Sequence, residues 1–128
     1  MENTIKTLLI LILLFILPCP YAFANDKLEH FGISSIFGAV SETYFHYKTD
    51  YEAGGRIIGG TIFGTIPGLV KEIIDSTQED NCFSGKDMAA NIAGAFAGSV
   101  IANLINTEIE IHLDKRKHRA TISFLYRF

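Results

Sequence analysis

The apolar residues of this chain recur at helical spacing along most of its length and then, near the C-terminus, at alternate positions. Three segments, at about 26–48, 54–75 and 84–106, have apolar residues three or four positions apart. That period predicts three helices, with one loop at 48–52 and another after Asp75. The sequence therefore predicts a mainly α protein with a three-helix core.

Polar residues mark the expected start of the first and third helices. Asp26 with Glu29, and Ser84 with Asp87, have the spacing of a capping box. In that motif, each of the two side chains bonds a free backbone N–H at the helix start. Pro67 lies inside the second segment and has no backbone N–H, so we expect a kink or break there.

Small residues recur at every fourth position of the second and third segments. They are Gly60, Gly64 and Gly68, and then Ala90, Gly94, Gly98 and Ala102. Glycine costs about 1 kcal/mol relative to alanine inside a helix, so a compensating close approach of another backbone is expected. We expect the two glycine-rich faces to meet each other, and they also offer a surface for a homo-oligomer.

The period changes to two over residues 107–128. Apolar residues alternate with polar ones from Ile109 to Leu113 and again from Ile122 to Phe128. Alternation is typical of strands, and a reversal around 114–119 would place both apolar faces on one side. We therefore expect a C-terminal β-hairpin that completes the helical domain of residues 25–106, or that docks on a partner.

The first 24 residues have the pattern of an export signal. Lys6 precedes an unbroken apolar run at 8–17, and Ala24 ends a small-x-small cleavage site. The run is about half of the roughly 20 residues that a membrane-spanning helix needs. We expect cleavage after Ala24 and a location in the periplasm or at the periplasmic face of a membrane.

The cysteines and the charge narrow the possible partners. Lipoprotein processing needs a small residue before its cysteine, and Pro18 precedes Cys19, so we favour cleavage over lipidation. Cys82 would then be the single remaining cysteine, without a partner for an internal disulfide. It could pair with another chain, but we expect a partly buried thiol in a loop. The net charge is −3 and the basic cluster at 115–119 is short, which argues against a nucleic-acid partner. We expect the partner to be the envelope membrane or another envelope protein.

Each predicted helix has polar residues near one end, and an antiparallel arrangement would gather these ends. The residues are Asp26, Lys27 and His30, then Lys71, Glu72 and Asp75, then Ser84, Asp87 and Asn91. Such a cluster could bind a divalent metal, perform acid–base chemistry, or only cap and pair the helices. No cofactor is specified, because no zinc or phosphate-loop spacing is present. As a catalytic site it would use His30, Glu72, Asp75 and Asp87, with the other residues binding the ligand.

Three further histidines carry weaker signals. Glu42 and His46 stand four residues apart and could hold a metal, but such pairs are common on helix surfaces, so we expect an exposed pair. His112 and His118 lie in or beside the predicted hairpin turn and are expected to be solvated.

The polar residues, taken in order, resemble a known family. The pattern is Asp26-Lys27-x-x-His30-Phe31, Lys71-Glu72-x-x-Asp75, and Ser84-x-x-Asp87-x-x-x-Asn91-x-x-Gly94-x-x-x-Gly98. It resembles the YfiM-like family of periplasmic proteins and lipoproteins and, more distantly, VanZ-like envelope membrane proteins. The resemblance implies a small helical envelope domain with a polar cluster made from these residues. It implies no particular reaction.

Three hypotheses for the function follow. The leading one is a non-enzymatic, membrane-apposed structural or interaction component of the cell envelope. The second is a hydrolase or lipid-headgroup enzyme that uses the histidine and carboxylate cluster. The third is an integral membrane protein of VanZ-like type.

Overall fold

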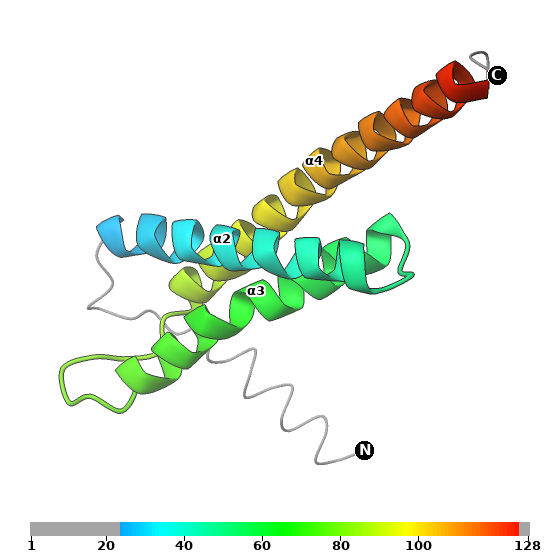
Figure 1. Cartoon of the computed structure of the whole chain (residues 1–128). Helices are drawn as coiled ribbons and strands as arrows, with labels where there is room; N and C mark the ends of the chain where they lie inside the picture. Colours follow the sequence, from blue (N-terminus) through cyan, green and yellow to red (C-terminus); the bar gives the residue numbers. More distant parts are fainter. Residues whose placement is uncertain (1–23, 126–128) are drawn as a thin grey trace, which may run out of the picture.

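The computed structural model describes the backbone of residues 24–125 and the side chains of residues 26–118. Within this part the chain forms three helices, α2 (Ala24–Lys48), α3 (Ala53–Asp75) and α4 (Gly85–Leu125) (Figure 1). The mainly α prediction is confirmed, and the two predicted loops lie where they were expected. The predicted export signal lies outside the described residues apart from Ala24, so it stays a prediction.

All three helices contact one another, and the contact between α2 and α4 is the most extensive. The C-terminal half of α4 projects beyond the other two helices (Figure 1). Every residue from 108 to 118 is accordingly exposed. The bundle proper is therefore made of α2, α3 and the first half of α4.

The predicted β-hairpin is wrong over the described residues, because α4 continues as one helix to Leu125. Residues 107–121 contain neither glycine nor asparagine, the residues that most readily adopt the positive φ angles of a tight hairpin turn. The same stretch is rich in good helix formers such as glutamate, lysine and arginine. Two pairs with helical i,i+4 spacing also form, Glu108–His112 at 3.8 Å and Asp114–His118 at 3.5 Å.

Glycines set how closely the helices approach. A Cβ at Gly94 would overlap the carbonyl of Phe31, and one at Gly98 would overlap the carbonyl of Ser35. The glycine-rich face of α4 therefore packs on α2, whereas we had expected it to meet α3. The glycines of α3 also pack against other helices of the same chain. A Cβ at Gly64, for example, would overlap the backbone of Gly38 in α2. An oligomer would have to use other surfaces than these glycines.

Two smaller expectations are also corrected. Helix α3 continues through Pro67 to Asp75, so the proline does not break it. Cys82, in the loop between α3 and α4, is disulfide-bonded, so the expectation of a thiol is wrong. The other cysteine of the sequence, Cys19, lies outside the described residues.

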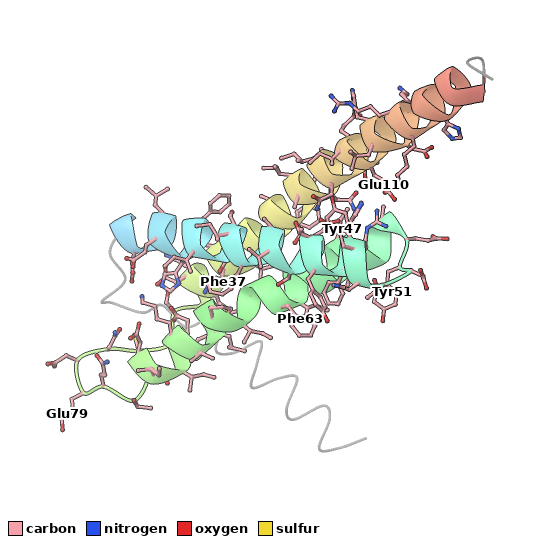
Figure 2. The ribbon with its side chains drawn as sticks, in the orientation of Figure 1. Phe37, Tyr47, Tyr51, Phe63, Glu79 and Glu110 are labelled. Carbon is pink, nitrogen blue, oxygen red and sulfur yellow. The ribbon has the colours of Figure 1, made fainter. Side chains whose placement is uncertain are left out.

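The distribution of polar and apolar side chains is the reverse of that in a water-soluble bundle. Among the described residues, the buried hydrophobic side chains are Met88, Ala95 and Ala102. The buried polar side chains are His30, Ser34, Glu42, Glu72, Ser84, Asp87, Asn91, Ser99, Asn103 and Asn106. Large apolar side chains lie at the outer surface of every helix, such as Phe37 and Phe63 in Figure 2.

Two of the helices are long and apolar enough to cross a membrane. They are α3 and the part of α4 from Gly85 to His118. The core helix of a soluble protein passes the same test but is mostly buried. Here only 22% of the apolar window of α3 and 44% of that of α4 are buried. Their outward apolar faces are suited to contact with a membrane.

Candidate functional site

The predicted polar ends of the helices meet at one end of the bundle, where α2 begins, α3 ends and α4 begins. We call the residues in contact there the His30 cluster. They are Asp26, His30, Ser34, Lys71, Glu72, Asp75, Ser84, Asp87 and Asn91. Eight of them were predicted from the sequence, and Ser34 was missed although it lies one turn after His30. Lys27, the remaining predicted residue, is half-buried and takes no part in the contacts described below.

His30 is the centre of the cluster and is only 3% exposed. Its Nδ1 lies 3.1 Å from Oδ1 of Asn91, which also accepts a hydrogen bond of 3.0 Å from Oγ of Ser34. An amide oxygen can only accept, so Nδ1 is the ring nitrogen that carries the proton. In a neutral ring the lone pair is then on Nε2, which is the chemically available atom of His30.

Three charged side chains surround Nε2 of His30. Nζ of Lys71 lies 3.0 Å away, Oε1 of Glu72 3.3 Å away and Oδ1 of Asp26 3.7 Å away. Lys71 also contacts Asp26 at 3.2 Å and Asp75 at 3.6 Å. The lysine ammonium group therefore lies among carboxylates, where it offsets part of their negative charge.

The start of α4 is capped differently from the capping box that we predicted. The backbone N–H of Asp87 donates to Oγ of Ser84 at 3.2 Å, as expected. The N–H of Ser84, however, donates to Oε2 of Glu72 at 2.7 Å, so a carboxylate of α3 replaces Asp87. Asp87 is thus freed from capping: it is 2% exposed, and its Oδ1 is buried without a hydrogen-bond partner.

A small cavity of about 80 Å³ opens beside His30. It is lined by Glu29, His30, Ile33, Pro67, Gly68, Lys71 and Asn91. A Cβ at Gly68 would overlap the side chain of Asn91, so this glycine leaves the room that the amide needs to orient His30. The cavity has space for a few water molecules or one small polar group.

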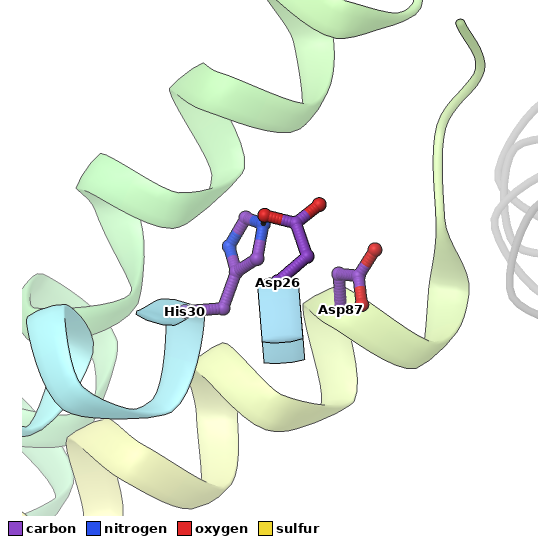
Figure 3. Close-up of side chains that lie close together, drawn as sticks. All are labelled: Asp26, His30 and Asp87. Carbon is purple, nitrogen blue, oxygen red and sulfur yellow. Dashed lines mark ion pairs between the residues drawn. The ribbon is translucent and has the colours of Figure 1, made fainter. Parts of the chain in front are cut away.

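Three residues of this cluster have the chemistry to hold a metal ion. Asp26 and His30 on α2 and Asp87 on α4 each offer one ligand atom, and these atoms all lie within 4.8 Å of one another. Figure 3 shows the imidazole beside the Asp26 carboxylate, with Asp87 near them on the neighbouring helix. One nitrogen and two carboxylate oxygens form a donor set that zinc, manganese and ferrous iron accept.

A second polar cluster surrounds Glu42, towards the end of the bundle where α2 ends and α3 begins. We call it the Glu42 cluster, and it consists of Glu42, Thr43, His46, Arg56, Asn103, Asn106 and Glu110. Glu42 is 0% exposed, so the expectation of an exposed Glu42–His46 pair is wrong. Its two oxygens accept hydrogen bonds from Nδ2 of Asn103 at 2.7 Å and Nδ2 of Asn106 at 2.8 Å.

We did not predict the Glu42 cluster, although α4 carries a sequence signal for it. Asn91, Ser99, Asn103 and Asn106 lie on one helical stripe of an otherwise apolar segment, and all four are buried. A polar stripe inside an apolar helix indicates a buried polar partner on a neighbouring helix. For Asn103 and Asn106 that partner is Glu42, whereas Asn91 contacts His30.

No protein-family model, curated protein or solved structure matches this chain. The resemblance to the YfiM-like family therefore stays a prediction that depends on the motif residues. The function has to be argued from the geometry.

Proposed function

We propose that the protein is an integral membrane component of the cell envelope, with a polar ligand site at one face of the bilayer. The observation that carries this proposal is the reversed burial, with polar groups inside and large apolar side chains outside all three helices. In water such a surface is unfavourable and prone to association. In lipid it is the expected arrangement, since intramembrane polar residues face the bundle interior.

The lengths of the helices fit this proposal. Helix α3 has 23 residues and α2 has 25, which correspond to roughly 35 Å at about 1.5 Å per residue. A hydrocarbon core is about 30 Å thick. The polar residues of α2 do not oppose insertion, because side chains such as Ser34 and Glu42 face the other helices. Small residues at the contacts, such as Gly94 and Gly98, are typical of helix packing in membranes.

Two features support an orientation with the His30 cluster on the exported side. Cys82, in the loop beside this cluster, is disulfide-bonded, and disulfides persist in oxidising compartments. At the other end, Lys48 and Arg56 lie near the loop between α2 and α3, and 115–117 adds three cations beyond the bundle. Cytoplasmic ends carry the excess of lysine and arginine. The predicted export signal would deliver Asn25 to the same exported side.

The cavity beside His30 supports ligand binding at that face. His30 lines the cavity, and Lys71, with a side chain that is 40% exposed, connects it to the surface. Polar headgroups and small ions are the ligands available at this depth. A binding or interaction role agrees with our leading hypothesis of an envelope interaction component. The location in the bilayer agrees with our third hypothesis of an integral membrane protein.

One observation favours an enzyme as the second candidate. The hydrogen bond to Asn91 leaves Nε2 of His30 unprotonated in the neutral ring, next to a cavity. A histidine held in one tautomer is suited to accept a proton from a bound substrate. The substrate would then be a lipid headgroup at the membrane surface.

Two kinds of labelling test the proposal. In native membranes, a lipid-dissolved photoreactive probe should label outward residues such as Ile62 and Phe96, whereas hydroxyl radicals generated in water should not. In spheroplasts, an impermeant amine reagent should modify Lys86, and Lys115 only after lysis. Labelling of Ile62 and Phe96 from the water phase would contradict membrane insertion. Labelling of Lys115 before lysis would contradict the orientation.

A further inference from the structure

We propose that Asp26, His30 and Asp87 bind one divalent transition-metal ion of the zinc class, and that Lys71 leaves its place when the ion arrives. This inference deepens the proposed function by naming a ligand for the same site. It rests on that proposal only for the access of the site to the exported side. The local geometry carries the rest.

The spacing of the donor atoms is the first argument. The ligand atoms of Asp26, His30 and Asp87 lie within 4.8 Å of one another. Donors about 2 Å from a tetrahedral zinc ion are about 3.3 Å apart, so small side-chain rotations are sufficient to close the site. Asp26 and His30 lie one turn apart on α2, and Asp87 lies in the first turn of α4. The ion would therefore join α2 to α4.

Asp87 supplies the second, independent argument. Its carboxylate is 2% exposed, and Oδ1 is buried with no hydrogen-bond partner. A buried carboxylate without a partner is unfavourable, and buried charges are normally paired or coordinate metals. The capping role that the sequence predicts for it is taken by Glu72, which accepts the N–H of Ser84 at 2.7 Å. Asp87 is thus positioned for a cation that the described residues do not supply.

His30 is prepared as a metal ligand. Its Nδ1 lies 3.1 Å from Oδ1 of Asn91, to which it donates, so in the neutral ring the lone pair is on Nε2. Metal-binding histidines commonly donate their other ring N–H to an oxygen acceptor, which fixes the ring orientation and the tautomer. Asn91 is itself held by Ser34 at 3.0 Å. The acceptor oxygen that orients His30 is therefore already in place.

Lys71 explains how the site is stable without a metal. Its ammonium lies 3.0 Å from Nε2 of His30 and 3.2 Å from Oδ1 of Asp26, so it occupies the region that a metal would take. Its side chain is 40% exposed, and Asp75 lies one turn further along the same helix, at 3.6 Å. The lysine can withdraw towards Asp75, where its charge stays paired. Metal and lysine then compete for one position.

The donor set favours a particular class of ion. One imidazole nitrogen with two carboxylate oxygens suits zinc, manganese or ferrous iron, whereas magnesium and calcium prefer oxygen ligands alone. Three protein ligands leave one position open, as in zinc sites that bind water or substrate. We therefore expect Zn²⁺ to bind much more tightly than Mg²⁺.

Zinc titration of the full chain tests the inference. The protein would be reconstituted in nanodiscs of phosphatidylethanolamine and phosphatidylglycerol, stripped with a chelator, and titrated against a chromophoric zinc competitor. We expect one Zn²⁺ per chain. Asp87→Asn and His30→Ala should each weaken binding by at least about tenfold, as loss of a ligand does. The matched controls Asp114→Asn and His118→Ala, an exposed pair on α4, should bind like the wild type.

A variant that binds zinc more tightly would exclude misfolding as the reason for the weaker binding of the other variants. Lys71→Met should bind Zn²⁺ about tenfold more tightly, because the competing ammonium is gone, and damage to the fold cannot produce this result. Absence of stoichiometric zinc, or equal binding by wild type, Asp87→Asn and His30→Ala, would overturn the inference. Wild-type chains that enter nanodiscs but bind no zinc would sink the metal site alone. Chains that stay in water would instead sink the membrane proposal, and the same titration could then be run without lipid.

Discussion

The His30 cluster and the Glu42 cluster use similar residues in the same bundle, but their buried carboxylates differ. In the Glu42 cluster, Nδ1 of His46 and Nε of Arg56 are buried without a hydrogen bond, whereas the central carboxylate is fully bonded. Both oxygens of Glu42 accept amide hydrogen bonds, and Arg56 and His46 face Oε1 at 3.5 Å and 3.6 Å. In the His30 cluster, one oxygen of Asp87 has no hydrogen-bond partner and a cavity opens beside the imidazole. The comparison distinguishes a polar network that holds helices together from one that awaits a ligand.

The difference has an energetic meaning. A buried polar network is disrupted as a whole when its central charge is removed, because several partners lose that acceptor together. An unpaired buried carboxylate has the opposite effect, since it costs free energy that its removal gives back. Substitutions in the two clusters should therefore change stability in different directions.

Glu42→Ala should have the largest effect. It leaves Asn103, Asn106 and Arg56 without their central acceptor, and breaking a buried charged network costs about 3–5 kcal/mol. The free energy of unfolding, measured by titration with a denaturing detergent, should fall by that amount. Glu110→Ala is the matched control, because Glu110 has a side chain that is 71% exposed and also pairs with His46. It should cost less than about 1 kcal/mol, and equal losses in both variants would remove the distinction between the clusters.

A charge on the outer surface should rank second. Ile62 is 59% exposed near the middle of α3, and an aspartate there would face lipid at a cost of about 2.5–3.5 kcal/mol in a membrane. In water, Ile62→Asp should be nearly neutral. Tyr51→Asp, at an exposed position in the loop between α2 and α3, serves as the control and should insert like the wild type. The measurement is the membrane-integrated fraction of each variant. Equal fractions for the two variants would contradict our account.

Glycine replacement should rank third. At Gly68 a Cβ meets the side chain of Asn91, so Gly68→Ala should cost about 1–3 kcal/mol by overpacking and should also weaken zinc binding. Gly54→Ala is the control, since a Cβ at Gly54 meets nothing within 4 Å. A stability of Gly68→Ala equal to that of Gly54→Ala would show that the packing at the His30 cluster is looser than described.

Asp87→Asn should have the smallest effect on stability. It removes a buried charge that has an unpaired oxygen while keeping the backbone bond to Ser84, so the metal-free unfolding free energy should stay within about 1 kcal/mol of wild type or rise. The same detergent titration measures it. A loss as large as that of Glu42→Ala would mean that Asp87 is a structural partner and that the two clusters are alike.

The helical core was predictable because the apolar period, the capping residues and the loop residues all indicate the same helices there. The N–H of Asp87 bonds Oγ of Ser84 as the capping motif predicts. The C-terminal hairpin failed for a physical reason: residues 108–118 are exposed, so no buried face selects between a period of two and a helical period. Helix propensity and continuity with the preceding turn then decide in favour of α4.

The site was predicted in part. Antiparallel packing correctly gathered the polar ends, since this depends only on helix order and short loops. The role of Asp87 was not predictable, because the bond from Ser84, directly before α4, reaches Glu72 in α3, 12 positions earlier in the sequence. An asparagine inside an apolar helix, such as Asn103, is unfavourable for membrane insertion if it faces lipid. Asn103 is buried against Glu42, and a sequence does not show which way a polar side chain faces.

Resistance to alkaline extraction tests the central claim, the membrane-embedded bundle, most directly. A protease site placed before Asn25, together with reduction of the Cys82 disulfide, would remove the leading apolar segment after membrane assembly, and intact mass would verify the fragment in each fraction. We predict that the fragment beginning at Asn25 stays in the membrane pellet through an alkaline carbonate wash and is released by detergent. Its recovery in the wash, folded and without detergent, would contradict the account.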